Sequence, residues 1–546
     1  MVGQDGPIYR SWYDKLTRVK TIDQVMAEIA EDEEAEGVSL NKTLTVFDVI
    51  SYGVGSTVGA GIFVVTGQAA REAGPAVVLS FVLASLACFF SAMAYSEYAA
   101  RVPVSGSAYT FTYTSLGELA AWFIGWNLTL EYSISAAAVA RGWASNLVLF
   151  IKQVGGHPPS WLDDIKLSDS FRLSPLAALI VILCTILLCY GVKESARFNM
   201  FITIMNVSVI IFIISLGSSH VQTSNWTDHG GFAPNGINGI VTGGAKAFFS
   251  YIGFDAVTTL SEEVKNPKRD IPIGACVTLA LATALYIGTT LVVTGMGPWH
   301  ELNQNTPLAS AFVDVGVGWA ATLIAAVTVT ALTATTICSL FGQPRVFYRM
   351  ARDGLIFKLF GKLDPKSKVP VLGTAVCGIP SAVLAFFMDI DTLSDMISIG
   401  TLMAFSTVCI GIVLMRYKNE ERPRTPLAAI SVYVVFTIVL SILLRHTDKV
   451  PLGVIIAMAV VTIVPIGFIY TMPVRMENLP TGFACPLVPL LPMLGVFTNV
   501  YLICSLDWES YLRIAIWTFL GMGIYAFYGF RYSRLGLNQS YMAIGD

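Results

Sequence analysis

Four glycines lie within nine residues of a strongly apolar stretch, SYGVGSTVGAGIF at residues 51–63. Such glycines could cradle a phosphate, but a dinucleotide-binding loop lies within a strand–helix–strand unit and needs an acidic residue about 20 positions further on. The segment that follows, VVLSFVLASLACFFSAMAYS, is too long and too apolar to be a second strand. Glycine destabilises a helix by about 1 kcal/mol relative to alanine. The run therefore predicts a helix that is interrupted at its centre.

A second interruption is predicted in FFSYIGFDAVTTLSEEVKNP, where Gly253 and Asp255 lie inside another apolar segment. An unwound segment frees backbone N–H and C=O groups, which hydrocarbon tolerates only beside a cavity or a ligand. Amides at a helix N-terminus attract an anion, and carbonyls at a helix C-terminus attract a cation. Two such breaks together are complementary to a zwitterion, such as a free amino acid.

The composition is that of a membrane protein. Only 13% of the 546 residues are charged, against about 25% in soluble domains. Residues 73–96 and 198–227 contain no charged side chain, and a membrane-spanning helix needs about 20 residues. The net charge of −3 gives no indication of a nucleic-acid partner, and the nine cysteines show no metal-binding spacing, so no metal or cofactor is expected. We predict an all-α polytopic membrane protein.

Hydropathy and charge gaps predict fourteen membrane spans. They lie at about 46–69, 75–96, 119–150, 175–192, 199–217, 239–261, 273–296, 315–341, 371–388, 393–415, 428–444, 452–471, 487–505 and 511–530. If the N-terminus is cytosolic, 25 of the 34 lysines and arginines lie in cytosolic segments and 7 in outer loops. Positive residues favour the cytosolic side, so both termini are predicted to be cytosolic.

Charged residues at membrane depth are rare and usually functional. Glu131 lies 13 residues after Glu118, about 20 Å along the same helix and near the membrane centre. Its carboxylate could neutralise a cationic ligand, or it could be a structural partner of Arg141 or of freed backbone groups. Asp255 could cap the freed amides of the second broken helix, or contact a ligand or a proton. Lys246 could extend to the outer vestibule or oppose the approach of cations.

Five motifs carry a resemblance to a known family. They are GVGSTVGAGIFVVTGQAAREAGPA, GWNLTLEY, YIGFDAVTTLSEEVKNPKRDIPIG, PRVFYRMARDGLIFK and DMISIGTLMAFS. Together they resemble the cationic amino acid transporter family of the amino acid–polyamine–organocation superfamily, over residues 44–531. The resemblance implies a leucine-transporter-like fold, in which spans 1–5 and 6–10 are inverted repeats and helices 1 and 6 are discontinuous, followed by four further helices. The domains would be a cytosolic segment 1–44, a transport core 45–416, spans 11–14 within 417–531, and a cytosolic tail 532–546.

The resemblance also implies a binding site built mainly from backbone. The substrate carboxylate would meet the backbone of four residues in the first break, and the α-amino group would meet carbonyls of three residues in the second: Val58, Gly59, Ala60 and Gly61, then Phe249, Ser250 and Ile252. Of the aromatic residues around the second break, Phe249, Tyr251 and Phe254 could either pack the core or gate the site.

Other positions follow from the comparison with family patterns. Glu131 matches an acidic residue of bacterial relatives. Glu118 matches the acidic residue of animal-type members, where it could act in gating or selectivity or be an ordinary solvated carboxylate at a helix start. Lys246 departs from the small or hydroxyl residue usual in the family. Asn206 replaces a lysine that bacterial relatives carry in span 5. Asn225, in the sequon Asn-Trp-Thr, could be glycosylated or lie in a chance tripeptide.

The expected function is transport of cationic L-amino acids (arginine, lysine, ornithine) by alternating access, as a potential-driven facilitator or exchanger. A neutral amino acid or polyamine carrier of the same fold, possibly proton-coupled, is the first alternative. A sensor that binds an amino acid without transporting it is the second. An enzyme is not expected, because all five histidines fall in outer loops without a nucleophile–base constellation. The expected partners are the substrate and the lipid bilayer, and the expected site is the plasma membrane, or else an endolysosomal or vacuolar membrane.

Overall fold

The computed structural model is almost entirely helical. It describes residues 16–28, 42–59, 61–102, 107–159, 161–162, 165–166, 172–191, 196–228, 230–261, 263–364, 369–417, 424–446, 450–474 and 482–535. Ala60, much of the predicted cytosolic segment 1–44 and residues 536–546 of the predicted tail lie outside these ranges.

The long helices of the bundle follow the predicted spans closely. They are α3 (Val46–Thr57), α4 (Thr66–Ala73), α5 (Val77–Arg101), α7 (Glu118–Gln153), α8 (Pro175–Cys189), α9 (Ala196–Ser218), α11 (Gly236–Ala247), α13 (Pro267–Met296), α15 (Gly318–Arg352), α16 (Val371–Phe387), α17 (Ile390–Arg416), α18 (Thr425–Arg445), α19 (Leu452–Tyr470), α20 (Leu490–Cys504) and α21 (Trp508–Ile524).

Short elements connect them. They are α6 (Ser107–Ser115), α10 (Ser224–Thr227), α12 (Ala256–Thr259), α14 (Pro307–Asp314), α22 (Phe530–Tyr532), the π-helical turns η1 (Gly61–Val65) and η7 (Tyr525–Gly529), and the 3-10 turns η2 (Gly74–Ala76), η3 (Phe248–Tyr251) and η4 (Lys358–Gly361). A two-residue antiparallel pair, β1 (Ile165–Lys166) with β2 (Arg172–Leu173), places Ile165 opposite Leu173.

Nine segments of the described chain are long and apolar enough to cross a membrane. One of them, Val46–Arg101, contains two predicted spans in a single run, and three further apolar helices are shorter: α8, α16 and α20. Helices lie at each predicted span, and the second broken span is divided among α11, η3 and α12. The total of fourteen spans, the inverted repeat and the domain boundary near residue 416 stay predictions.

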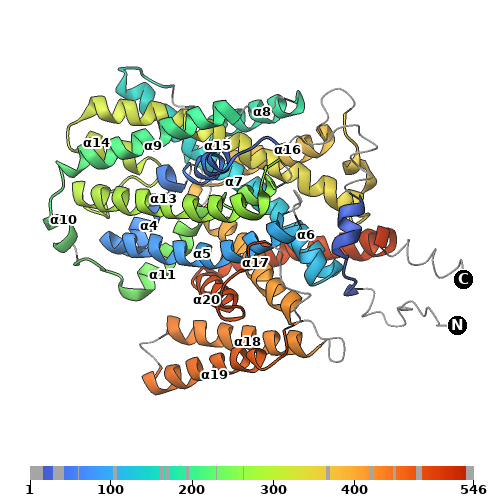
Figure 1. Ribbon diagram of the computed structural model, residues 1–546. Coiled ribbons are helices and arrows are strands. Elements are labelled where there is room, and N and C mark those ends of the chain that lie inside the picture. Colours follow the sequence, from blue (N-terminus) through green and yellow to red (C-terminus); the bar gives the residue numbers. More distant parts are fainter. Residues whose placement is uncertain are drawn as a thin grey trace, which may run out of the picture.

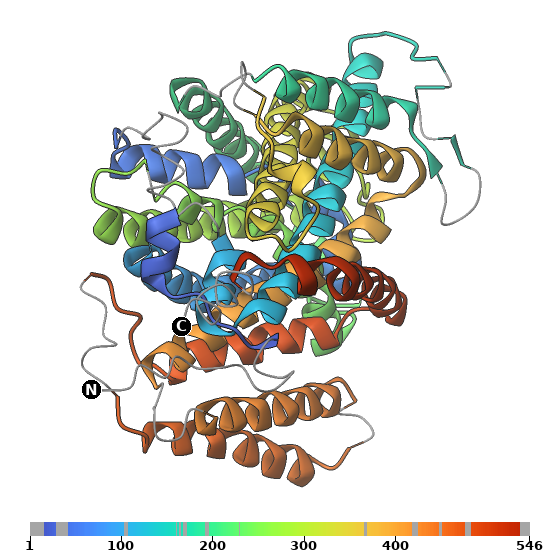
Figure 2. The same ribbon diagram turned by 90° about the vertical axis from the view of Figure 1, so that its right-hand side faces the viewer.

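The bundle has a main body and an appended pair of helices. Helix α7 lies in the main body and packs against α15, α17, α16 and α8. Helices α18 and α19 pack against each other at one edge of the molecule, and α20 lies between this pair and the core (Figure 1). The same separation of the pair from the main body is seen after a 90° rotation (Figure 2).

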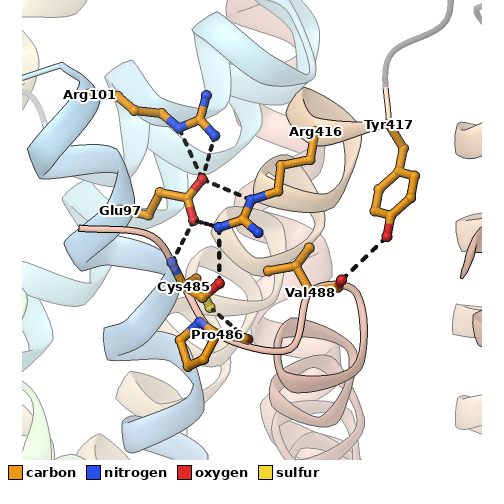
Figure 3. Close-up of polar contacts among 7 residues, drawn as sticks. All are labelled: Glu97, Arg101, Arg416, Tyr417, Cys485, Pro486 and Val488. Atoms are coloured by element: carbon orange, nitrogen blue, oxygen red, sulfur yellow. Dashed lines mark hydrogen bonds and ion pairs between the residues drawn. The ribbon is translucent and has the colours of Figure 1, made fainter. Parts of the chain in front are cut away.

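A buried carboxylate joins the segment after α19 to the core. Glu97 of α5 is fully buried and accepts hydrogen bonds from Arg101 Nε at 3.0 Å and Arg416 Nε at 3.1 Å (Figure 3). Its other oxygen accepts from the backbone N–H of Cys485 at 2.8 Å, and Arg416 Nη2 donates to the Cys485 carbonyl at 2.9 Å. One carboxylate therefore fixes the ends of α5 and α17 and the chain that leads into α20.

Two further carboxylates, those of Glu118 and Asp353, bind residues near both ends of the described chain. Glu118 accepts from Arg18 Nη2 at 3.3 Å, and from the hydroxyls of Tyr113 at 3.0 Å, Tyr525 at 3.0 Å and Ser533 at 2.5 Å. Because Glu118 is fully buried, its interpretation as a solvated helix-start carboxylate is wrong.

Asp353, after α15, is the second of these carboxylates. It accepts from Lys20 Nζ at 2.7 Å and from the Tyr109 hydroxyl at 2.6 Å, and its carbonyl accepts from the Arg534 N–H at 3.0 Å. Residues 16–28 and 525–535 thus meet on one side of the bundle.

Substitution Glu97→Gln tests the first of these clusters. It keeps the side-chain size but leaves Arg101 and Arg416, each with a side chain at most 10% exposed, without their carboxylate. Removing one partner of a buried ion pair costs about 3–5 kcal/mol, so we expect a large fall in the thermal unfolding midpoint. The matched control is Glu509→Gln, which breaks an exposed pair with Arg513 worth about 0–1 kcal/mol. Equal falls in the two variants would contradict a central role for Glu97.

Candidate functional site

The first broken helix ends at Thr57 and resumes at Gly61. Val58 has non-helical backbone angles, φ −83° and ψ 78°, and its N–H donates to the Val54 carbonyl at 2.7 Å. The Gly59 N–H donates to the Thr57 carbonyl at 3.0 Å. The first N–H groups of a helix have no acceptor within it, and among the described residues the N–H groups of Gly61 and Ile62, at the start of η1, have no acceptor. The predicted interruption is present at the predicted place.

The second broken helix passes from α11 through η3 into an extended segment. Ile252 adopts φ −62° and ψ 128°, and Gly253 has φ +125°, a left-handed value that disfavours any residue with a Cβ. The Asp255 carboxylate accepts from the Gly253 N–H at 3.2 Å, inside the break. Of the two roles that the sequence leaves open for Asp255, the capping of the following half-helix is not seen, because Asp255 makes no side-chain cap hydrogen bond in α12; contact with a ligand or a proton stays a prediction.

The two breaks lie in direct contact. A Cβ built on Gly61 would come within 2.2 Å of Ser250 Cα, and one on Gly253 within 2.7 Å of the Ser56 carbonyl oxygen. The Ser56 hydroxyl contacts the carbonyls of both Gly53 and Gly253 at 3.0 Å. Glycine is therefore required in each break by close backbone approach to the other.

Tyr286 of α13 lies between the two breaks. Its hydroxyl is 2.8 Å from the Thr57 carbonyl and 2.8 Å from the Ser250 carbonyl, one on each broken helix. The residue is fully buried and its ring contacts those of Phe81 and Tyr251 edge to face. The sequence alone does not indicate Tyr286 or Ser56, because the contacts of Tyr286 with Thr57 and of Ser56 with Gly253 join residues 229 and 197 positions apart.

Some of the backbone carbonyls that were expected to bind the substrate already accept hydrogen bonds from other residues of the chain. The Phe249 carbonyl accepts from the Ile252 N–H at 3.2 Å, and the Ser250 carbonyl from Tyr286. The Ile252 carbonyl has no partner among the described residues. The groups that remain open are therefore the amides at the start of η1 and the carbonyl of Ile252, which have opposite polarity and lie on the two touching breaks.

Glu131 is connected to the same region through α17. It is 5% exposed, it accepts a hydrogen bond from the Thr401 hydroxyl, and its Oε2 atom is buried without a partner in the described part of the chain. Phe405 lies one turn after Thr401 on α17. The centroid of its ring is 5.6 Å from that of Phe248 and 5.0 Å from that of Phe254. Arg141 donates instead to the Phe386 carbonyl at 3.1 Å, so the structure does not pair it with Glu131.

Comparisons with known proteins identify the family. The family described as "Amino acid permease" matches residues 44–476, and the family described as "C-terminus of AA_permease" matches residues 483–533. The chain is 36% identical to "Cationic amino acid transporter 4, vacuolar" of Arabidopsis thaliana, covering 96% of both chains. It is 33% identical to "Cationic amino acid transporter 4" of Homo sapiens, over 97% of this chain and 93% of the relative. This chain belongs to the cationic amino acid transporter family.

The family also includes relatives with other names. The chain is 33% identical to "Branched-chain amino acid permease BcaP" of Bacillus subtilis, over 95% of this chain and 98% of the relative. The family and its relatives support amino acid transport by an integral membrane protein.

Lys246, where this chain departs from the family pattern, forms an ion pair. Its Nζ donates to Glu72 Oε1 at 3.0 Å, and only 9% of its side chain is exposed. Glu72 lies on α4 and Lys246 on α11, so the pair joins the segments that flank the two breaks on the same side. Lys246 is thus neutralised by Glu72, and whether it affects selectivity stays a prediction.

The other candidate residues from the sequence are buried or form hydrogen bonds. Tyr251 and Phe254 are fully buried; the Tyr251 hydroxyl donates to the Phe81 carbonyl at 3.1 Å. Asn206 of α9 is 2% exposed, and its Oδ1 has no partner among the described residues. The Asn225 Nδ2 atom, to which a glycan would attach, donates to the Gly295 carbonyl at 2.8 Å. The proposed roles of these residues in gating, coupling and glycosylation stay predictions.

Substitution Gly61→Ala tests the contact between the breaks. The added methyl group would overlap the Ser250 backbone, which cannot rotate away as a side chain can. Overpacking costs about 1–3 kcal/mol, so we expect the uptake of labelled substrate to fall about tenfold or more. A matched control is Gly523→Ala in α21, where a Cβ meets nothing within 4 Å. Both variants are compared at equal amounts of folded protein, and wild-type uptake by Gly61→Ala would contradict the close contact.

Proposed function

We propose that this protein transports cationic L-amino acids such as arginine, lysine and ornithine by alternating access. The observation that carries the proposal is the buried, unpartnered Oε2 of Glu131. A buried carboxylate oxygen without a partner is costly, and a cationic substrate side chain would remove that cost. The substrate carboxylate would meet the amides that begin η1, near Gly61, and its amino group the carbonyl of Ile252.

The first alternative is a carrier of neutral amino acids, which a relative named as a branched-chain amino acid permease supports. The backbone contacts of the two breaks recognise only the α-amino and α-carboxyl groups, so they do not distinguish among side chains. A polyamine is less favoured, because it has no carboxylate for the amides of η1. Glu131 is therefore the residue on which the choice between a cationic and a neutral substrate depends.

Uptake of labelled arginine, leucine and putrescine into proteoliposomes tests the proposal, with Glu131→Gln as the key variant. We expect arginine uptake by wild type. We expect a loss of about 100-fold or more in Glu131→Gln, because a buried cation without a counter-ion costs several kcal/mol. Glu301→Gln, which removes a carboxylate that is 71% exposed, is the matched control and should be unaffected. Near-normal arginine uptake by Glu131→Gln would make Glu131 structural. Binding of arginine without flux would instead indicate a sensor.

We further propose that transport is driven by the membrane potential rather than by a proton or sodium gradient. Asparagine at position 206 cannot titrate, whereas a buried lysine at such a position can take up and release a proton. One positive charge is worth about 2.3 kcal/mol per 100 mV, so the potential alone could accumulate arginine about 50-fold.

The coupling is tested by clamping the potential in proteoliposomes and varying the proton and sodium gradients separately. Arginine uptake should follow the voltage and be independent of both gradients. Uptake that follows either gradient at fixed voltage would overturn the facilitator mechanism. Variant Asn206→Ala, which cannot titrate either, should show the same voltage dependence as wild type.

The location expected for this activity is the plasma membrane, with both termini in the cytosol. The excess of lysine and arginine in the segments predicted to be cytosolic supports this orientation. The name of the Arabidopsis relative, which includes "vacuolar", supports a vacuolar membrane as the alternative.

A further inference from the structure

A polar cavity lies away from the two breaks, between α11 and the added C-terminal helices. Its volume is about 300 Å³, and it is lined by residues of α11, of the end of α18 and of the end of α20. Among these residues are Thr242, Ser441, Arg445, His446 and Tyr501. A space of this size with so many polar side chains can hold a polar group.

One side chain in this cavity is buried and unsatisfied. Ser441 is fully buried, and its hydroxyl has no hydrogen-bond partner among the described residues. Thr437, one turn earlier on α18, is also buried without a hydroxyl partner among the described residues, whereas the exposed Ser431 donates to the Leu427 carbonyl at 2.8 Å. A buried polar group without a partner needs an explanation, and a ligand in the cavity supplies one.

Arg445 is held with part of its guanidinium still available. Its Nη1 atom donates to the Cys504 carbonyl at 2.7 Å and to the Leu506 carbonyl at 3.1 Å. These two bonds fix the orientation of the group, while Nε and Nη2 have no partner in the described part of the chain. A fixed guanidinium with free N–H groups is suited to binding a phosphate.

The charge of the cavity favours an anion. Arg445 is the charged side chain among the described lining residues, which include no aspartate or glutamate. His446 adds a second group that can carry a positive charge, and Thr242, Ser441 and Tyr501 add hydroxyl donors. Hydrogen bonds between charged donors and phosphate oxygens are stronger than those between neutral groups.

Apolar side chains beside the cavity indicate what the anion is attached to. Ile438 and Ile442, on the same helix as Ser441, are 40% and 48% exposed, and Ile237 of α11 is 71% exposed. In an integral membrane protein, such side chains face lipid. We propose that the cavity binds the phosphate-bearing headgroup of a membrane phospholipid, with the acyl chains lying along Ile438 and Ile442.

A bound headgroup would connect the helix that leads into the second break with the added C-terminal helices. Thr242 lies six residues before Phe248, about 9 Å along the helix from the second break, whereas Arg445 and Tyr501 belong to the added helices. The lipid would therefore hold α11 against α18 and α20. This inference depends only on the cavity and is independent of the substrate that the protein transports.

The test is native mass spectrometry of the delipidated full-length protein, titrated with phosphatidylglycerol, with diacylglycerol, which lacks the phosphate, and with inorganic phosphate. We expect saturable binding of one phosphatidylglycerol and at least tenfold weaker binding of diacylglycerol. Ser441→Leu fills the cavity without breaking a hydrogen bond, and Arg445→Gln removes the charge while keeping an N–H donor for the Cys504 carbonyl. Each should weaken phosphatidylglycerol binding at least tenfold.

Ser431→Leu is the matched control, because it makes the same change at an exposed position of α18, and it should bind phosphatidylglycerol as wild type does. Equal binding by wild type and Ser441→Leu, or equal binding of diacylglycerol and phosphatidylglycerol, would overturn the proposal. Displacement of the lipid by inorganic phosphate at a similar concentration would show a site for a small free anion and would overturn the assignment to lipid.

Discussion

The structure depends on the contact between two interrupted helices. Each break frees backbone groups that a hydrocarbon environment cannot satisfy. The two breaks lie against each other, so that each provides polar or packing contacts for the other. Gly61 lies against Ser250, Ser56 contacts Gly253, and the Tyr286 hydroxyl lies within hydrogen-bonding distance of both helices. The few groups left open, the amides that begin η1 and the Ile252 carbonyl, match the two ends of an amino acid. In the proposed mechanism, recognition of the α-amino and α-carboxyl groups would use the same geometry that makes the breaks tolerable.

Selectivity for one class of side chain must then come from another element. Glu131 is on α7, which packs along α15 and α17 in the main body. It is connected to the breaks through α17, where Thr401 binds its carboxylate and Phe405 packs against Phe254. In the proposed mechanism, recognition of the amino acid backbone is thus separate from recognition of its side chain. Relatives that are 36% and 33% identical to this chain and carry different substrate names are consistent with such a separation.

The sequence predicted the breaks well, because glycine in an apolar helix has a local physical meaning. The placement of Glu131 on the same helix as Glu118 could be predicted for a similar reason, whereas its depth in the membrane stays a prediction. The partners of the charged residues could not be predicted, since they depend on contacts between distant segments. Glu118 resembles a solvated helix-start residue until Arg18, Tyr525 and Ser533 are seen to cover it. Likewise, Lys246 is an unexplained cation in the sequence and half of an ion pair with Glu72 in the structure.

The burial of Glu97 and Glu118 also has a consequence for biosynthesis. The backbone N–H that donates to Glu97 belongs to Cys485, which is synthesised 388 residues later. The hydroxyl that donates to Glu118 belongs to Ser533, which is synthesised 415 residues later. Until the last helices emerge from the ribosome, these two carboxylates lack partners that they have in the finished fold. The nascent chain therefore completes these two charge clusters only when translation is almost over. A prematurely terminated chain would expose unpaired acidic and basic groups that a quality-control system could recognise.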